Sequence, residues 1–386
     1  MGSDKYFKKR YRGKVDTPLN KKLESVEWGE YILDDLFEIN SSKKIFHANE
    51  INQIFHEQVN NSFPYVVRTT QNNGIRGYII KDEIYANEKN TLSFAQDTFS
   101  VFYQKEKYFT GNKVKILKAK FENSTEQVMQ YLTASFQKSL NSSTWGLGST
   151  VETIAKTKIQ LPIKNKKIDF EFMESFITEL EKEQVAKLEA YLLASGLKDC
   201  ILSDEEQYVL DDFENEKIEF GEFKVEKLFE INSYKKRFDA NKVVISDAGN
   251  PYVVRTALNN GIRGYINEDR VYLNDGNTIS FGQDTATMFY QEKPYFTGDK
   301  IKILKSKNDK FNKLNGLFFI STMTKSFSSF SWGGSSFNVG IIGNQPMNLP
   351  TKNKEPDYKT MQTLISAIQK QVIKDVVLYA DKKLGE

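Results

Sequence analysis

The polar residues of this chain that are best suited to chemistry occur twice, at a fixed separation. Residues 64–79 return as residues 251–266, and the arginine that they share gives an offset of 255 − 68 = 187 residues. The shared polar side chains are of the kinds that hydrogen-bond to phosphates and to base edges. They are Arg68/Arg255, Asn72/Asn259, Asn73/Asn260, Arg76/Arg263, Gln96/Gln283, Asp97/Asp284 and Lys113/Lys300. This pattern predicts contact with a nucleic acid.

Each of these residues, taken singly, also has a plain structural interpretation. Asn73, Gly74 and Asp97 can shape turns, and Arg68 can pair with an acidic neighbour. Taken as a group beside turns and strand ends, and with basic residues nearby, they favour contact with DNA. The other members of the candidate set are Lys43, Lys44, Thr70, Gln71, Lys235, Lys236 and Arg237.

Positions that differ between the two copies are candidates for distinguishing two halves of a target, because the shared positions would hold the fold or contact phosphates. Gln71 stands opposite Leu258, with Thr70 opposite Ala257. Residues 99–101 differ from residues 286–288, and the loop 47–61 is longer than its counterpart.

The same sequence contains little that matches the motifs of known catalytic sites. No Gly-x-Gly-x-x-Gly follows a strand, and there is no P-loop. Asn250-Pro251-Tyr252 lacks the second proline of the amino-methyltransferase motif and is interpreted as the start of a strand. Glu222-x-Lys224 fits the Glu-x-Lys of metal-dependent nucleases, but the lysine is absent from the first copy. The sequence therefore argues against an enzyme and a metal site.

Composition sets the class of protein. The 386 residues suffice for two domains of about 150 residues with connecting elements. The net charge of +3 permits nucleic-acid binding without requiring it. No apolar run approaches the roughly 18 residues of a membrane span, and the first residues lack the apolar core of a signal peptide. The single cysteine, Cys200, excludes an intrachain disulfide, so a reducing bacterial or archaeal cytoplasm is expected.

The elements that must position these residues also recur. Short strands rich in β-branched and aromatic residues are followed by an amphipathic helix near 126–136 and another near 313–323. Glycine-rich loops come next, in which Trp145 and Trp332 are interpreted as core or loop anchors, with base-stacking platforms as the alternative. Each copy ends in a Leu-Pro strand, Leu161-Pro162 or Leu349-Pro350, and a long helix.

The apolar spacing places the long helices near 169–195 and 357–384. We therefore expect a mixed α/β (α+β) fold of two modules and two helices. The expected boundaries are an N-terminal arm (1–25), a first module (26–166), a central helix (167–197), a linker (198–217), a second module (218–353) and a C-terminal helix (354–386).

This layout resembles the DNA specificity subunits of Type I restriction–modification enzymes and the similar subunits of Type IIB systems. The resemblance covers nearly the whole chain. It rests on tandem modules that each end in a Gly/Ser-rich loop, the Leu-Pro strand and a long helix. It implies that each module is similar to the small DNA-binding domain of adenine methyltransferases and reads one half of a split target.

The resemblance also implies the partners. Double-stranded DNA, adenine methyltransferase subunits and a separate or fused restriction subunit would assemble on this non-catalytic chain. S-adenosylmethionine and Mg²⁺ would be bound by the partner subunits and no cofactor by this chain. A DNA-binding scaffold outside restriction–modification is the alternative. The residues expected to face partners are Met173, Ile177, Leu180, Met361, Ile365 and Ile368.

The resemblance gives the long helices a second role, as an antiparallel coiled-coil spacer with pseudo-two-fold symmetry. A helix of about 27 residues spans about 40 Å, since an α-helix rises about 1.5 Å per residue. This is close to one turn of DNA, about 34 Å. Longer helices should therefore lengthen the gap between the half-sites.

Overall fold

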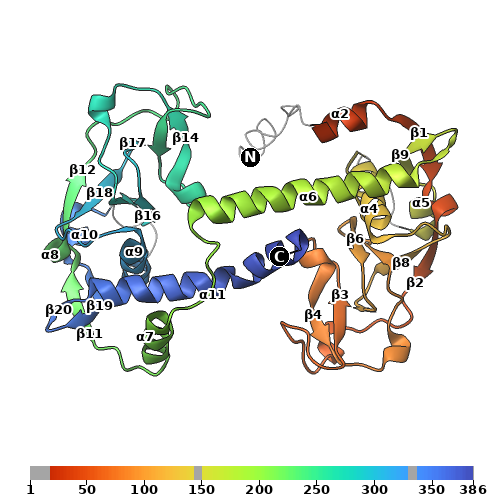
Figure 1. Ribbon diagram of the computed structural model, residues 1–386, viewed down its shortest axis with the longest axis horizontal. Helices are drawn as coiled ribbons and strands as arrows, with labels where there is room; N and C mark the ends of the chain where they lie inside the picture. Colours follow the sequence, from red (N-terminus) through yellow and green to blue (C-terminus); the bar gives the residue numbers. More distant parts are fainter. Residues whose placement is uncertain (1–17, 143–149, 329–336, 386) are drawn as a thin grey trace. The chain divides into compact units, whose positions relative to one another are not determined.

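The computed structural model describes residues 18–142, 150–328 and 337–385 (Figure 1). The chain divides into two compact units, Met1–Lys187 and Leu188–Glu386. No helix of the described residues is long and apolar enough to cross a membrane. The two glycine-rich loops, with Trp145 and Trp332, lie outside the described residues.

The first unit is built from three small sheets. A four-stranded sheet has the order β2-β8-β5-β6, and three-stranded sheets have the orders β4-β3-β7 and β1-β9-β10. The strands are β1 (Glu27–Ile32), β2 (Phe37–Ser41), β3 (Phe63–Val66), β4 (Ile75–Ile79), β5 (Thr91–Ala95), β6 (Ser100–Gln104), β7 (Phe109–Thr110), β8 (Val114–Ala119), β9 (Lys158–Lys164) and β10 (Lys167–Ile168).

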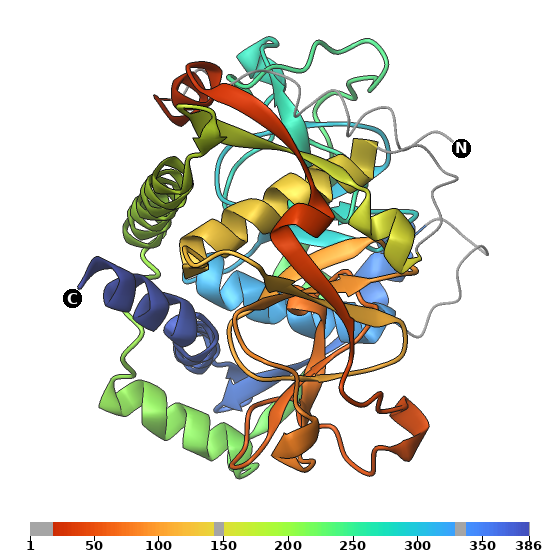
Figure 2. The same cartoon turned by 90° about the vertical axis from the view of Figure 1, so that its right-hand side faces the viewer.

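Helices pack on these sheets, and the last of them continues into the second unit. They are α2 (Pro18–Glu24), α3 (Leu33–Leu36), α4 (Glu126–Ser142), α5 (Val151–Ala155) and α6 (Phe170–Ser195). The amphipathic helix expected from the sequence is α4, which packs against β5, β6 and β9 (Figure 2). The apolar core under it includes Phe94, Leu117 and Phe136, all fully buried. Short helix α2 shows that the N-terminal arm holds regular structure.

The second unit repeats this order. Its sheets have the orders β12-β18-β15-β16, β14-β13-β17 and β11-β19-β20. Its strands are β11 (Phe220–Lys224), β12 (Phe229–Ser233), β13 (Asn250–Val253), β14 (Ile262–Ile266), β15 (Thr278–Gly282), β16 (Met288–Gln291), β17 (Phe296–Thr297), β18 (Ile301–Ser306), β19 (Pro346–Lys352) and β20 (Glu355–Pro356). Its helices are α7 (Asp204–Glu214), α8 (Val225–Leu228), α9 (Lys313–Phe327), α10 (Val339–Asn344) and α11 (Tyr358–Leu384).

The two long helices expected from the apolar spacing are α6 and α11. Gly196 ends α6 with a φ of +71°, and the N–H of Leu197 donates to the Leu192 carbonyl at 2.9 Å. A glycine in the left-handed region is the usual end of a helix of this kind. The last turns of α6 belong to the second unit, where Leu192 is buried against Val377 and Ala380 of α11.

The segment expected to be a linker, 198–217, carries helix α7. Ser203 caps α7 and forms a capping box with Glu206. Glu206 also accepts hydrogen bonds from Ser366 at 2.6 Å and from Lys370 at 3.0 Å, both on α11. Burial alone would raise the pKa of Glu206, but the hydrogen bonds from Ser203, Ser366 and Lys370 outweigh it and lower the pKa to about 2.

This buried contact gives a stability prediction. Because the folded pKa of Glu206 lies below its ordinary value of 4.5, its contribution is present above about pH 4.5 and is lost as the pH falls towards 2. We expect Glu206→Gln to lower the free energy of unfolding by about 1–3 kcal/mol at pH 7. The deficit should shrink in urea titrations at lower pH. Glu205→Gln, whose exposed carboxylate pairs with Lys359, is the control and should change stability by less than about 0.5 kcal/mol.

Candidate nucleic-acid interface

An ion triad stands at the ends of three strands in each repeat. Arg68 follows β3, Asp97 follows β5 and Lys113 precedes β8. Lys113 Nζ donates to Asp97 Oδ1 at 3.0 Å, and Arg68 pairs with the same carboxylate. The hydrogen bonds from Lys113 and from Arg68 lower the pKa of Asp97 below its usual value. The triad therefore presents two cations and one anion, with a net positive charge, on a partly exposed surface.

The second repeat builds the same triad. Arg255 pairs with Asp284, and Lys300 Nζ donates to Asp284 Oδ2 at 2.9 Å. The structure thus confirms that the shared arginine has an acidic neighbour. It also brings Arg68, Asp97 and Lys113, separated in sequence, to one place.

Each triad borders a surface groove, and the two grooves are formed by matching residues. In the first repeat Arg68 and Arg76 line it together with His47 from the long loop. Its floor is Tyr65, buried, whose hydroxyl donates to the Phe46 carbonyl at 2.7 Å. In the second repeat the lining includes Arg237, Phe238, Asp239, Ala240, Tyr252, Val254, Arg255, Thr256, Thr285, Gly298 and Asp299.

The grooves differ in charge at two matching positions. Where the first has His47 and Asn112, the second has Asp239 and Asp299. Arg237 also lines the second groove, 3.6 Å from Asp299, whereas its counterpart in the first repeat, uncharged Ile45, does not line the first groove. The two repeats thus offer similar shapes with different charge patterns, as two half-sites of unlike sequence would need.

The asparagine pairs shape the turn beside the groove. Asn72 and Asn73 have φ of +46° and +53°, values that asparagine tolerates. Their side-chain amides donate to the carbonyls of Ile75 at 3.1 Å and Tyr103 at 2.8 Å. The second repeat has the same contacts, from Asn259 to Ile262 and from Asn260 to Tyr290. The turn-forming interpretation is therefore confirmed, and these amide N–H groups already serve the backbone.

A buried glutamine that the sequence analysis did not select supports this turn. Gln104 Nε2 donates to the Asn73 carbonyl at 3.1 Å and to Ser93 Oγ at 2.9 Å. Gln291 makes the matching pair of contacts in the second repeat. The sequence contained a signal for this residue, because both copies have glutamine at this position, Gln104 and Gln291, at the 187-residue offset.

Gln104→Ala should therefore loosen the turn. It leaves the Asn73 carbonyl and Ser93 without this buried donor, which costs about 1–3 kcal/mol. We expect a lower midpoint of denaturation and faster amide exchange at residues 72–74. The exposed Gln71→Ala variant serves as the control. Unaltered exchange in Gln104→Ala would contradict a supporting role.

The remaining basic candidates stand outside the two triads. Lys44 Nζ lies 4.2 Å from the centre of the Tyr85 ring, and Lys236 Nζ lies 4.2 Å from that of Tyr272. Lys43 and Lys235 are exposed beside them. A cation on an aromatic face keeps its charge at the surface, so Lys44 and Lys236 remain available to a phosphate, whereas Lys235 pairs with Asp275 at 3.8 Å.

Comparison with known proteins identifies the family. The model of the Type I restriction modification DNA specificity domain matches the chain twice, at residues 25–190 and 217–382. The chain belongs to this family. The specificity subunit S.BcgI of a Type II restriction enzyme from Heyndrickxia coagulans is 23% identical over 353 residues, which cover 90% of this chain and 96% of that protein. A solved Type I S subunit from M. genitalium shares the fold, with a TM-score of 0.60, 13% identity and coverage of 94% and 93%.

Each specificity-domain match takes in one module and most of the long helix behind it. Recognition of a DNA target as a subunit of a restriction–modification system is thus the function of the family. A scaffold outside such systems is not favoured.

The candidate catalytic motifs have structural roles. Glu222 and Lys224 lie in β11, where Lys224 Nζ donates to Asn344 at 3.0 Å. Asn250-Pro251-Tyr252 forms β13, as expected. Within the described residues, no group of three or more metal-ligating side chains is placed to hold a metal ion.

Some residues expected at the surface of this specificity subunit are in its core. Met173 and Met361, expected to face partners, are fully buried beneath their own modules, and Ile177 is 9% exposed. The reason is that the first turns of α6 and α11 complete the module cores. Leu180 and Ile368 also pack on apolar clusters, and Ile365 is half-buried.

One pair of candidate half-site readers needs the same correction, whereas the predicted DNA contacts of Gln283 and Gln96 stay predictions. Val101 and Met288, considered as half-site readers, are buried in the cores because their strands turn these side chains inward. Gln283 donates from Nε2 to the Phe337 carbonyl at 2.8 Å and so holds the chain after the glycine-rich loop. Gln96 is partly buried. By contrast, Thr70, Gln71 and Arg76 are exposed, and Arg263 is partly exposed.

Proposed function

We propose that this chain reads a bipartite DNA target, one half with each repeat, for a restriction–modification complex. The observation that carries the proposal is the duplicated groove with its Arg-Asp-Lys triad. Arg68 and Arg255 stand at matching places in it, whereas His47 and Asp239 differ. Shared cations suit phosphates, which are the same at every base pair, and the differing side chains suit bases.

In this proposal the chain supplies recognition and its partners supply chemistry. Adenine methyltransferase subunits dock on α6 and α11 and bind S-adenosylmethionine, and a separate or fused restriction subunit cleaves with Mg²⁺. Exposed apolar residues on these helices, such as Tyr191, Val372 and Tyr379, offer contact area for partners. The complex acts in the cytoplasm, where its DNA lies.

The test is methylome sequencing of cells that express the chain with the methyltransferase encoded beside it. A split motif with methyladenine in both halves, lost when the chain is deleted, is the expected result. A methylation pattern that is the same with and without the chain would overturn the proposal.

The spacing role has its own test. Inserting four helical residues after Lys187 in α6 should lengthen the helix by about 6 Å. We expect the gap between the methylated half-sites to grow by about one to two base pairs, at about 3.4 Å each. The half-site sequences should stay the same, because the grooves are untouched. An unchanged gap in an active complex would argue against α6 as the spacer.

A further inference from the structure

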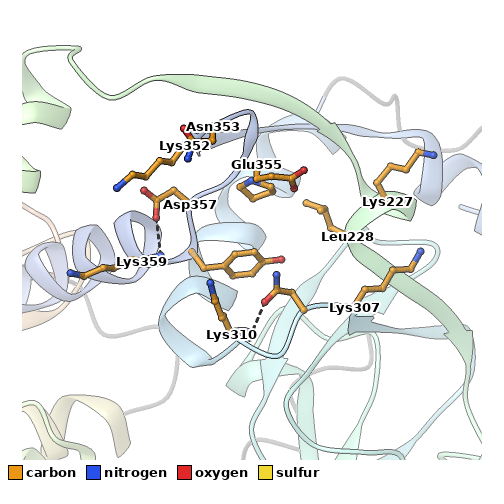
Figure 3. A pocket seen from close by; sticks show the side chains of 12 residues that line it. Lys227, Leu228, Lys307, Lys310, Lys352, Asn353, Glu355, Asp357 and Lys359 are labelled. Carbon is orange, nitrogen blue, oxygen red and sulfur yellow. Dashed lines mark hydrogen bonds between the residues drawn. The ribbon is translucent and has the colours of Figure 1, made fainter.

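A pocket lined by lysines lies where α11 begins in the second repeat (Figure 3). Helix α8, the loop after β18, the hairpin β19–β20 and the first turn of α11 form its walls. Two carboxylates, Glu355 and Asp357, also line it. The five lysines give the lining a net charge of 5 − 2 = +3; they are Lys227, Lys307, Lys310, Lys352 and Lys359.

Three of these lysines remain available to a ligand. Lys307 Nζ donates to the Glu226 carbonyl at 2.7 Å, and Lys359 pairs with Glu205 at 2.6 Å. Lys227, Lys310 and Lys352 are exposed, and no described residue accepts a hydrogen bond from their ammonium groups.

The positive charge of the pocket comes from the lysines, since the helix end is already capped. The carboxylate of Asp357 accepts the backbone N–H groups of Lys359 and Thr360, both at 3.1 Å. In Figure 3, Lys227 and Lys307 lie on one side of the pocket and Lys352 and Lys359 on the other. Lys227, Lys352 and Lys359 are drawn with their ammonium groups directed outward, so their flexible stems would have to turn inward for these groups to meet an anion from two directions.

The first repeat fills the corresponding place with an aromatic ring. Phe121 stands at the position of Asn308 (121 + 187 = 308). Its ring stacks on Phe170 with centroids 4.9 Å apart, and Phe170 corresponds to Tyr358 of the second repeat. With the smaller, polar Asn308 in that position, Tyr358 forms part of the pocket lining.

The charges change together with the shape. Where the second repeat has Lys227, Lys310 and Lys359, the first has Asp35, Asn123 and Glu171. Three lysines therefore replace two acids and an amide, whereas Glu355 replaces Lys167, so the matching positions carry no net charge in the first repeat and +3 in the second.

We propose that this pocket of the second repeat is a binding site for a phosphate group. Lysine ammonium groups are compact charges that suit phosphate, and a phosphate monoester carries about −1.5 to −2 charges at pH 7. The charge of three free ammonium groups is matched better by a phosphate monoester than by a single carboxylate, which carries only one negative charge. The phosphate can come from a nucleic-acid backbone or from a free phosphate compound.

The site is separate from the recognition groove and goes beyond the proposed function. Lys300 of the triad precedes β18, and Lys307 follows it. Seven residues of extended chain span about 23 Å, at about 3.3 Å per residue. The two sites therefore lie at opposite ends of the strand. A substitution can abolish ligand binding at one site and leave binding at the other unchanged.

Equilibrium dialysis of the full-length chain with radiolabelled pyrophosphate tests the site. We expect one pyrophosphate per chain, with binding weakened about tenfold or more in Lys227→Gln/Lys352→Gln, since charge-assisted hydrogen bonds are lost. Asn308→Phe keeps every lysine but restores the aromatic ring of the first repeat, and it should also abolish binding. Lys164→Gln, at the matching position of the first repeat, is the control and should bind normally.

A competition experiment identifies the source of the phosphate. If duplex DNA displaces pyrophosphate, and Lys352→Gln lowers the salt dependence of DNA binding by about one phosphate contact, the site holds the DNA backbone. If DNA does not displace it, the ligand is a free phosphate compound. Absence of pyrophosphate binding, or tighter lysine-dependent binding of hexaglutamate, would overturn the proposal, the latter by assigning the pocket to an acidic protein segment.

Discussion

Replacing Arg68 by glutamine is expected to weaken binding of target DNA by about 10- to 100-fold. Arg68 lines the groove of the first repeat and shares the Asp97 carboxylate with Lys113. The substitution removes one cation, while Lys113 still neutralises Asp97, so the fold keeps its ion pair. A charge-assisted hydrogen bond to phosphate is worth about 1.5–3 kcal/mol. DNA binding of the assembled complex, measured across a range of salt concentrations, gives the result.

The salt dependence separates a lost phosphate contact from a damaged fold. Loss of one contact should reduce the slope of log affinity against log salt by about one. Asp97→Asn is the matched variant that changes the net charge of the triad in the opposite direction. It leaves both cations and removes the anion, so binding to non-target DNA should tighten. If both variants weakened binding with unchanged slopes, the triad would be structural only.

Exchanging Gln71 for leucine is expected to change the base preference of one half-site and leave the other intact. The same turn holds both residues, because Thr69 accepts the N–H of Gln71 and Thr256 accepts that of Leu258, each at 3.2 Å. Both side chains are exposed, Leu258 at 64%. Glutamine can form two hydrogen bonds with adenine, whereas leucine offers only apolar contact, for instance with a thymine methyl group.

The expected size of this change is about 1–3 kcal/mol of discrimination at one base pair, or roughly 5- to 150-fold. Methylome sequencing with the Gln71→Leu chain measures it directly. The reciprocal Leu258→Gln should alter only the other half-site. Because neither side chain is buried, stability should change by less than about 0.5 kcal/mol. Methylation of an unaltered motif by both variants would remove Gln71 and Leu258 from the reading residues.

Internal repetition and apolar spacing were enough to predict the architecture of this protein. A duplication, offset by 187 residues over its central part and by 192 residues near its start, defined two modules. Apolar periodicity placed α4, α6, α9 and α11 close to their observed bounds. These features depend on neighbouring residues, such as the helix-ending Gly196, so local pattern was sufficient. The same duplication marked the polar residues, including Arg68 and Asp97, that the fold gathers into one triad.

The contacts of each marked side chain, by contrast, became evident from the three-dimensional fold. The amides of Asn72 and Asn73 are directed to backbone carbonyls, and Met173 completes a core, although periodicity placed it on an apolar helix face as readily as Leu180. Such choices depend on partners distant in the chain. The pocket at Asn308 shows this dependence clearly. In the first repeat Phe121 stacks on Phe170, whereas in the second the smaller Asn308 leaves Tyr358 in the pocket lining, and this pairing across the fold is not evident from the local sequence.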